Sequence, residues 1–193
     1  MSNTARFAAA MVLVAAGLVG ACASRPPGSA VDSRPVVQRA SLDPTRLELA
    51  PLDYTRFCLR HAADCELGVP DAVIEMTPEL EAAIEQINRD VNQRIRSVRI
   101  TTDWRIDPES GNCNDYVVTK RHELLALGLP ASALLIAVAR TPAGEGHLLL
   151  IVRTDRGDLV LDNLTIEIRR RAETRYAWIK RQSARDASLW ERM

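Results

Sequence analysis

The order of helical and strand-like patterns along the chain is the strongest constraint on its fold. Residues 78–95 carry apolar side chains at helical spacing, so one face of this segment is expected to meet a core. The stripe consists of Leu80, Ile84, Ile87, Val91 and Ile95. Thr77 and Pro78 open it as an N-cap hydroxyl and a first-turn proline. A second helix is expected over residues 113–127, because Gly128 and Pro130 follow it as stop signals.

Apolar runs follow these helices. Residues 133–139, 147–154 and 158–168 are expected to form strands, with a turn at residues 155–157. The arginine-rich residues 169–193 are expected to form a helix with a solvated charged face. Helices followed by strands predict an α+β fold in which N-terminal helices pack on an antiparallel sheet.

Composition narrows the class of protein. The chain has 193 residues, enough for one ordinary globular domain. Its 25 basic and 25 acidic side chains cancel, and aromatic residues make up only 4%. A nucleic-acid partner is therefore not expected, since such proteins carry a basic excess or an aromatic stacking surface.

The first residues resemble an export signal. An apolar segment at residues 7–20 follows Arg6 and is too short to span a bilayer comfortably. Small residues then lead into Cys22, as in a bacterial lipobox, where the cysteine is lipidated. The alternative is ordinary cleavage after Ala23. The expected organisation is a signal peptide with a lipobox at 1–22, a flexible tether at 23–50 and a catalytic domain at 51–193. Both alternatives predict a periplasmic protein, which is either anchored to the outer membrane only through its lipid or exported in soluble form.

Two cysteines lie close together in the sequence. An exported protein meets oxidising conditions, so Cys58 and Cys65 are expected to form a disulfide. The alternative is a reduced and buried pair. Their spacing, with no further Cys or His pair nearby, is poor for structural zinc.

Cys113 then remains without a structural role. It lies at a loop-to-helix junction, where free backbone N–H groups and the helix dipole favour a thiolate. Its backbone N–H could also contribute to an oxyanion hole. The alternative is a buried thiol that packs as a small apolar side chain.

A nucleophilic cysteine needs a base and a group that orients the base. His147 begins a predicted strand, and Asp162 lies on the next one; His61 and His122 are more simply surface residues. A four-residue loop between these strands would make His147 and Asp162 diagonal neighbours on one face, about 7–8 Å apart at the backbone. A three-residue loop would place them on opposite faces, and a two-residue loop would separate them along the strand.

Five blocks of sequence together resemble the bacterial transglutaminase-like cysteine proteinases, which include the LapG-type periplasmic proteases. They are GNCNDY at 111–116, TKR at 119–121, GEGH at 144–147, VRTD at 152–155 and LVLDN at 159–163. The resemblance implies a papain-like fold. It also implies Cys113 as nucleophile, His147 as general base and then acid, and Asp162 as the group that orients the imidazole. Trp104 and Asn112 would border the site, although a core position for Trp104 fits equally well.

The sequence departs from the family pattern beside the nucleophile. The usual block has acidic residues on both sides of the cysteine, and in LapG-type enzymes they help to bind calcium. Here these positions are Asn112 and Asn114, and only Asp115 keeps its charge. Calcium prefers several oxygen ligands with carboxylate charge. We therefore expect no required cofactor, with these three residues as weak calcium ligands at most.

The leading hypothesis is a cell-envelope cysteine protease that works through an acyl-enzyme. By resemblance, its partners would be a surface adhesin as substrate and a membrane-bound receptor that controls access. A transglutaminase or deamidase would use the same three residues with a different acceptor. A catalytically silent envelope lipoprotein that binds a partner is the non-enzymatic alternative.

Overall fold

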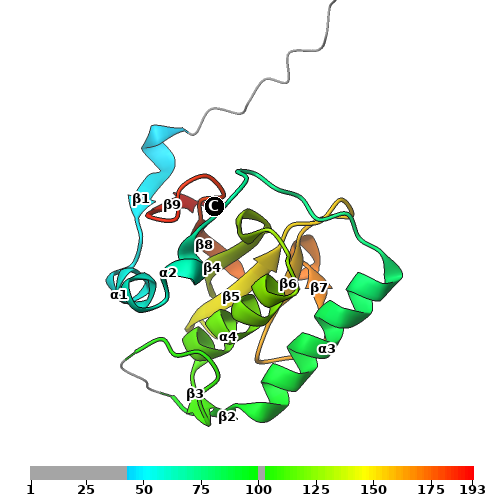
Figure 1. Ribbon diagram of the computed structural model, residues 1–193. Coiled ribbons are helices and arrows are strands. Elements are labelled where there is room, and N and C mark those ends of the chain that lie inside the picture. Colours follow the sequence, from blue (N-terminus) through cyan, green and yellow to red (C-terminus); the bar gives the residue numbers. More distant parts are fainter. Residues whose placement is uncertain (1–42, 100–102) are drawn as a thin grey trace, which may run out of the picture. The chain divides into compact units, whose positions relative to one another are not determined.

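A seven-stranded sheet organises the chain, and neighbouring strands in it run antiparallel in the order β1-β9-β8-β4-β5-β6-β7 (Figure 1). The computed structural model describes residues 43–99 and 103–193. The strands are β1 Leu47–Leu49, β4 Leu134–Arg140, β5 Gly146–Val152, β6 Leu159–Leu161, β7 Arg169–Arg170, β8 Ala177–Gln182 and β9 Leu189–Arg192. The predicted signal peptide, Cys22 and residues 23–42 of the predicted tether lie outside the described residues.

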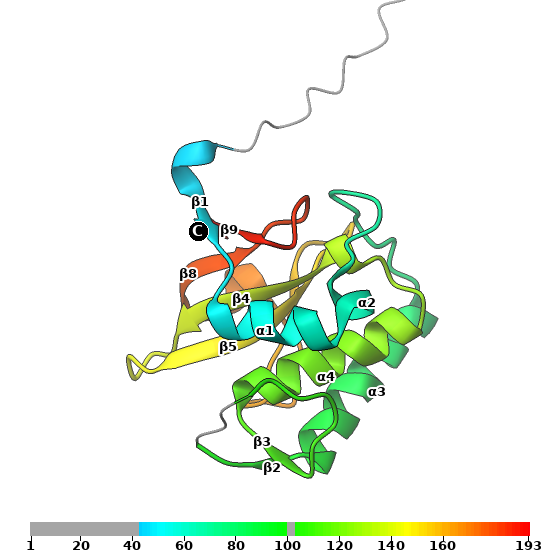
Figure 2. The same cartoon turned by 60° about the vertical axis from the view of Figure 1, so that its left-hand side comes forward.

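Helices cover the sheet (Figures 1 and 2). They are α1 Leu52–Arg60, α2 Ala62–Cys65, α3 Pro78–Arg94 and α4 Cys113–Ala126, with short 3₁₀ turns η1 Pro44–Arg46, η2 Ala131–Ala133 and η3 Arg171–Glu173. Two short parallel strands, β2 Arg96–Ser97 and β3 Ser110–Gly111, connect α3 to α4. Helix α4 contacts both β5 and α3. The α+β fold with helices on an antiparallel sheet is confirmed.

The two long helices form where the sequence predicted them. The Thr77 hydroxyl accepts a hydrogen bond from the backbone N–H of Leu80 at 3.2 Å, so it caps α3 as expected. Ile84 and Val91 of the predicted stripe are buried. In α4, residues from Asp115 to Arg121 are all buried, because the helix has neighbours on several sides. Hence α4 has no single apolar face.

The C-terminal segment differs from its prediction. Residues 169–193 do not form a helix; they supply β7, β8 and β9. The basic side chains of the last two strands are paired across the sheet, since Lys180 and Arg192 both contact Glu48 of β1. Arg181 pairs with Glu191 of β9 in the same way. Trp190 of β9 is fully buried. Strand pairing and burial therefore outweigh the local charge pattern that suggested a helix.

The fold also begins earlier than predicted. Residues Leu47–Leu49, assigned to the tether from sequence, form β1 and pair with β9. The predicted boundary at residue 51 is therefore several residues too late. Their short apolar pattern gave no signal, because the strand depends on a partner more than a hundred residues away.

A disulfide joins Cys58 of α1 to Cys65 at the end of α2, with 5.6 Å between their Cα atoms. The predicted pairing is confirmed. Nearby, Tyr54 and Phe57 of α1 are buried in the main core together with Trp104 and Trp190. The disulfide thus fixes the turn between the two short helices that cover this part of the core.

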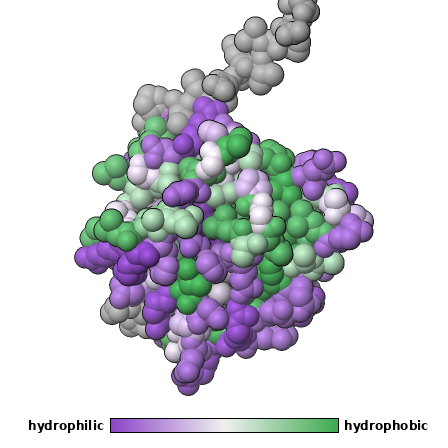
Figure 3. All heavy atoms as spheres, in the orientation of Figure 1, coloured by the Kyte–Doolittle hydropathy of each residue, from purple (hydrophilic) through white to green (hydrophobic). Residues whose placement is uncertain are grey.

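Polar residues cover much of the molecular surface seen in Figure 3, most of all over its lower part. Among the described residues, none of the helices is both long and apolar enough to cross a membrane.

Candidate active site

Cys113 is the first residue of α4, and a capping box fixes the start of this helix. The Asn112 Oδ1 accepts a hydrogen bond from the backbone N–H of Asn114 at 3.0 Å. In return, Asp115 Oδ2 accepts one from the backbone N–H of Asn112 at 2.9 Å. Cys113 is the free cysteine of the described residues and is half-buried. Its thiol is therefore held at a helix N-terminus on a fixed backbone.

Asp115 also anchors the loop that leads into the helix. Its Oδ1 accepts a hydrogen bond from the backbone N–H of Arg105 at 2.9 Å, and the carboxylate is fully buried. Each oxygen of Asp115 thus accepts a backbone hydrogen bond within the chain. From the sequence, Asp115 is expected only as a weak calcium ligand. An acidic residue three positions after Asn112 is the signal that could have shown its capping role.

His147 lies near the start of β5, and Asp162 directly follows β6. The register between the strands pairs Leu150 with Leu161 and Val152 with Leu159. This is the register of the four-residue loop, the alternative that makes His147 and Asp162 diagonal neighbours. The imidazole Nε2 lies 2.8 Å from Asp162 Oδ1, and both side chains are almost completely buried.

The surroundings of His147 favour its charged form. Burial by itself lowers the pKa of His147, but hydrogen bonds to Asp162 and to Cys113 and the charges of both groups raise it to about 9. Since Nε2 is bonded to Asp162, Nδ1 is the ring nitrogen that remains available to another group. The structure therefore pairs His147 of β5 with Asp162 at the end of β6, and Cys113 at the start of α4 contributes to the raised pKa of the same imidazole.

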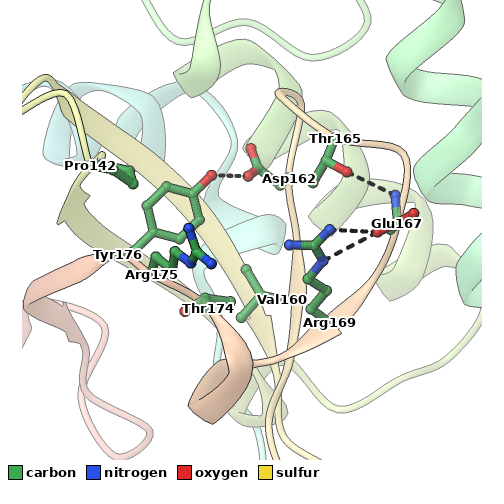
Figure 4. A pocket seen from close by; sticks show the side chains of 9 residues that line it. All are labelled: Pro142, Val160, Asp162, Thr165, Glu167, Arg169, Thr174, Arg175 and Tyr176. Carbon is green, nitrogen blue, oxygen red and sulfur yellow. Dashed lines mark hydrogen bonds and ion pairs between the residues drawn. The ribbon is translucent and has the colours of Figure 1, made fainter.

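The carboxylate of Asp162 has further partners. Its Oδ1 also accepts a hydrogen bond from the backbone N–H of Leu164 at 2.9 Å, and the Tyr176 hydroxyl donates to Oδ2 (Figure 4). Burial raises the pKa of Asp162, but the hydrogen bonds from His147, Leu164 and Tyr176 outweigh it, so the pKa lies below its usual value. The Tyr176 ring also lies 5.7 Å from the His147 ring, centre to centre. Sequence reasoning missed Tyr176, because residues 169–193 were expected to be a solvated helix.

The main chain at Asp162 is held from the helix side. Its carbonyl oxygen accepts hydrogen bonds from Lys120 Nζ of α4 and Asn92 Nδ2 of α3, each at 2.8 Å. Lys120 is 1% exposed. Burial lowers the pKa of Lys120 to about 7, although the charge of Asp162 acts in the opposite direction. Two helices thus fix the loop that carries the orienting carboxylate.

Other residues named from the sequence lie elsewhere. Trp104 is buried in the aromatic core, with its ring 5.7 Å from Tyr54, so the core alternative describes it. His61 is half-buried and stacks on Phe57 at 4.8 Å. Asn112 does border Cys113, but its side-chain oxygen serves as the helix cap.

The second histidine outside the triad has a structural partner. His122, near the end of α4, lies 2.8 Å from Asp64 Oδ1 through its Nδ1. Asp64 belongs to the disulfide-linked α2. This pair therefore connects α4 to α2.

The residues beside Cys113 do not fit a tight calcium site. Asn112 Oδ1 and both oxygens of Asp115 already accept backbone hydrogen bonds, which leaves the uncharged amide of Asn114 as the remaining predicted ligand. Calcium requires six to eight oxygen ligands with carboxylate charge among them. Within residues 43–99 and 103–193, no group of three or more His, Cys, Asp or Glu side chains could hold a metal ion.

The model of the bacterial transglutaminase-like cysteine proteinase family matches residues 45–193. The chain belongs to this family. The resemblance inferred from the five sequence blocks is thereby confirmed. The protein is therefore a cysteine peptidase. Its match begins close to β1, in agreement with the early start of the fold.

Solved structures of LapG from Legionella pneumophila are similar to this proteinase. The calcium-bound structure has 22% identity and a TM-score of 0.49, and the match covers 58% of this chain and 68% of that one. A second LapG structure has 24% identity and a TM-score of 0.49, with 58% and 67% covered. The EGTA-treated structure has 22% identity and a TM-score of 0.48, with 59% and 68% covered. No significant match was found among curated proteins.

Proposed function

We propose that this proteinase cleaves a peptide bond through an acyl-enzyme on Cys113, with His147 as general base and then acid and Asp162 as the orienting group. The observation that carries this proposal is the position of His147. Its Nε2 lies 2.8 Å from Asp162 Oδ1, and Cys113 is close enough to help raise the pKa of His147. The pairing of His147 with Asp162 supports the proposed order of nucleophile, base and orienting group that nucleophilic catalysis requires.

In the proposed resting pair the thiol proton is already on His147 Nδ1, in agreement with the raised pKa of His147, and in the first half-reaction the sulfur attacks the substrate carbonyl carbon. A bond forms between sulfur and carbon, and the carbonyl oxygen becomes an oxyanion. The C–N bond then breaks, and the imidazolium gives its proton to the leaving amine. Asp162 keeps Nε2–H oriented and stabilises the imidazolium, in agreement with the raised pKa of His147.

In the second half-reaction, water replaces the amine. His147 takes a proton from the water, whose oxygen attacks the thioester carbon, and the C–S bond breaks to return the Cys113 thiol and a carboxylic acid. The backbone N–H of Cys113 has no acceptor among the described residues and lies at the N-terminus of α4. It is therefore available to donate to the oxyanion in both steps.

A thiol-reactive probe tests this proposal without a known substrate. At pH 7, Cys113 should react with iodoacetamide at least about tenfold faster than a free thiol, because it is paired with an imidazolium. His147→Ala should remove this advantage, whereas His122→Ala is the matched control and should retain it. A rate equal to that of a free thiol in the wild type would contradict the proposal and favour the binding-protein alternative.

The acceptor distinguishes a hydrolase from a transglutaminase or deamidase. Once a substrate is found, hydrolysis in H₂¹⁸O should introduce one ¹⁸O atom into a new carboxyl terminus. An ammonia product with an intact backbone would indicate a deamidase. Incorporation of an added primary amine would indicate a transglutaminase.

We also propose that the protein acts in the cell envelope, as a periplasmic lipoprotein anchored through Cys22. The apolar segment at residues 7–20, the lipobox-like residues before Cys22 and the Cys58–Cys65 disulfide support this location. Fractionation of cells that express wild-type protein and Cys22→Ser tests it. The wild type should be found in the membrane fraction, and the variant should lose its lipid; recovery of both from the cytoplasm would contradict the proposal.

The proposed substrate is a protein in the same compartment, such as a surface adhesin whose access a membrane-bound receptor controls. An envelope proteome from cells with Cys113→Ala, compared with wild type, should contain one or more surface proteins in uncleaved form. Identical proteomes would argue against an envelope protein as substrate.

A further inference from the structure

A cavity of about 170 Å³ lies next to the triad (Figure 4). Asp162 and Val160 form part of its lining, and both are buried side chains. The Tyr176 ring forms another part, and Arg175 and Arg169 also line the cavity. This volume is below the roughly 300–1,000 Å³ of sites that enclose a whole drug-sized molecule. It is of a size to hold one side chain.

Two acidic and two basic side chains line the cavity, and three of these four have a charged or hydrogen-bonding partner. Glu167 is the acidic residue on the rim, and its carboxylate accepts two hydrogen bonds from Arg169, at 2.6 and 3.2 Å. Asp162 is already bonded to His147 and Tyr176. Arg175 is exposed and has no carboxylate within ion-pair distance among the described residues. The cavity therefore presents one guanidinium without an ion-pair partner beside the apolar surface of Val160 and Tyr176.

The cavity also has a defined place relative to the reaction. His147 gives its proton to the leaving amine, so the substrate segment after the cleaved bond lies on the His147 side and the acyl segment stays on Cys113. Asp162 and Tyr176 belong to the cavity lining, and both contact His147. The cavity is therefore on the His147 side of the proposed site, the same side as the leaving segment.

We propose that this cavity is a specificity pocket for an acidic side chain, Asp or Glu, in the substrate segment that follows the cleaved bond. The carboxylate would pair with Arg175, because a guanidinium binds carboxylates in a planar, two-pronged geometry. The methylene groups would lie against Val160 and the Tyr176 ring. This inference rests on the proposed peptidase function, and it adds a substrate class to it.

Digestion of a proteome-derived peptide library, followed by sequencing of the new N-termini, tests the pocket. The wild type should produce N-termini enriched in Asp or Glu at one of the first positions. Arg175→Glu should reverse this preference toward Lys or Arg and raise KM for an acidic peptide about tenfold or more. Arg56→Glu on α1, also an exposed arginine, is the control and should keep the wild-type preference.

The outcomes separate the two proposals. If Cys113-dependent cleavage occurs without acidic enrichment, or if Arg175→Glu behaves as Arg56→Glu does, the pocket assignment is wrong and the peptidase proposal stands. If the wild type gives no Cys113-dependent cleavage, the peptidase proposal fails and the pocket assignment falls with it. Faster cleavage of basic peptides by Arg175→Glu than by wild type would support the assignment, since damage to the fold cannot produce a gain.

Discussion

Lys120 Nζ donates a hydrogen bond to the main-chain oxygen of Asp162 at 2.8 Å, and so connects the helix that begins with Cys113 to the loop that orients His147. Both residues are buried. The distance between nucleophile and orienting carboxylate is thereby set by a contact inside the core. Asn92 supports the same oxygen from α3.

Lys120→Met should separate activity from stability. The variant loses the hydrogen bond to the Asp162 loop, so peptide cleavage should fall about tenfold to a hundredfold, in line with the roughly 1.5–3 kcal/mol of a bond from a charged donor. The melting temperature should stay equal or rise, because replacing a buried charge with an apolar side chain is often neutral or stabilising. Activity assays and calorimetry measure the two effects. The control is Lys180→Met, which removes the only other lysine and should leave cleavage unchanged.

The pH dependence of stability gives a second readout for Lys120. Its pKa is about 7 in the folded chain and 10.5 in the reference state. As the pH falls from 10.5 to 7, the unfolded chain takes up a proton that the folded chain does not, so this residue lowers stability over that range. Lys120→Met should remove this slope. An unchanged slope would contradict the burial of a titrating lysine.

Asp162→Asn should shift the pH range of catalysis. The pKa of His147 lies at about 9, above its ordinary 6.5. Its stabilising effect is complete below pH 6.5 and is lost as the pH rises through 9, and cleavage should decline over the same alkaline limb. Without the carboxylate charge the pKa of His147 falls, so the limb should move to lower pH. Profiles of kcat/KM measure this shift, and Asp90→Asn on α3 is a control. An unmoved limb would mean that Asp162 does not set the charge of His147.

Gly111→Ala should change the position of Cys113 indirectly, through the capping box of α4. A Cβ at Gly111 would lie 2.6 Å from Cβ and Oδ2 of Asp115, closer than side chains tolerate. The capping box would have to shift, so unfolding should become easier by about 1–3 kcal/mol and Cys113 alkylation slower. Gly146→Ala, next to His147, meets no atom within 4 Å and serves as the matched control. Equal alkylation rates for both variants would show that the capping box does not position Cys113.

Removal of the disulfide should destabilise the domain. Cys58 and Cys65 are separated by 7 residues, and a loop of this length gives about 2–3 kcal/mol of stabilisation in the chain-entropy model. The double variant Cys58→Ser, Cys65→Ser should therefore unfold at lower urea concentration. Cys113→Ser retains the disulfide and should change the midpoint far less. Equal midpoints for the double variant and the wild type would contradict a structural role for this bond.

Calcium should bind weakly at most. The oxygens of Asn112 and Asp115 are occupied by backbone hydrogen bonds, so no saturable binding is expected in the ~10⁻⁷–10⁻⁵ M range of sensor sites. The double variant Asn112→Asp, Asn114→Glu adds two carboxylates and should bind calcium more tightly than the wild type. Calorimetric titration measures both. Binding by the wild type in the sensor range would contradict the expectation.

Local sequence determined the two long helices and the disulfide. Thr77 and Pro78 begin α3, and the apolar stripe faces the core, because capping and periodicity act over a few neighbouring residues. The pairing of Cys58 with Cys65 follows in the same way from short spacing. The order of helices and strands was enough to predict the α+β class. The sequence blocks around Cys113, His147 and Asp162 were enough to indicate the family.

Tertiary structure alone decided how these residues meet and what holds them. The sequence allowed three registers for His147 and Asp162, and pairing of β5 with β6 selected one. Tyr176 lies beside His147 and Asp162 because the strand that follows it, β8, pairs with β4 and β9. No local charge pattern predicts this pairing. The role of Lys120 likewise depends on a carbonyl 42 residues away in sequence. Contacts between distant segments leave no local periodicity in the sequence. For this reason the candidate catalytic residues could be predicted from the sequence, whereas the residues that hold them in place, Tyr176 and Lys120, could not.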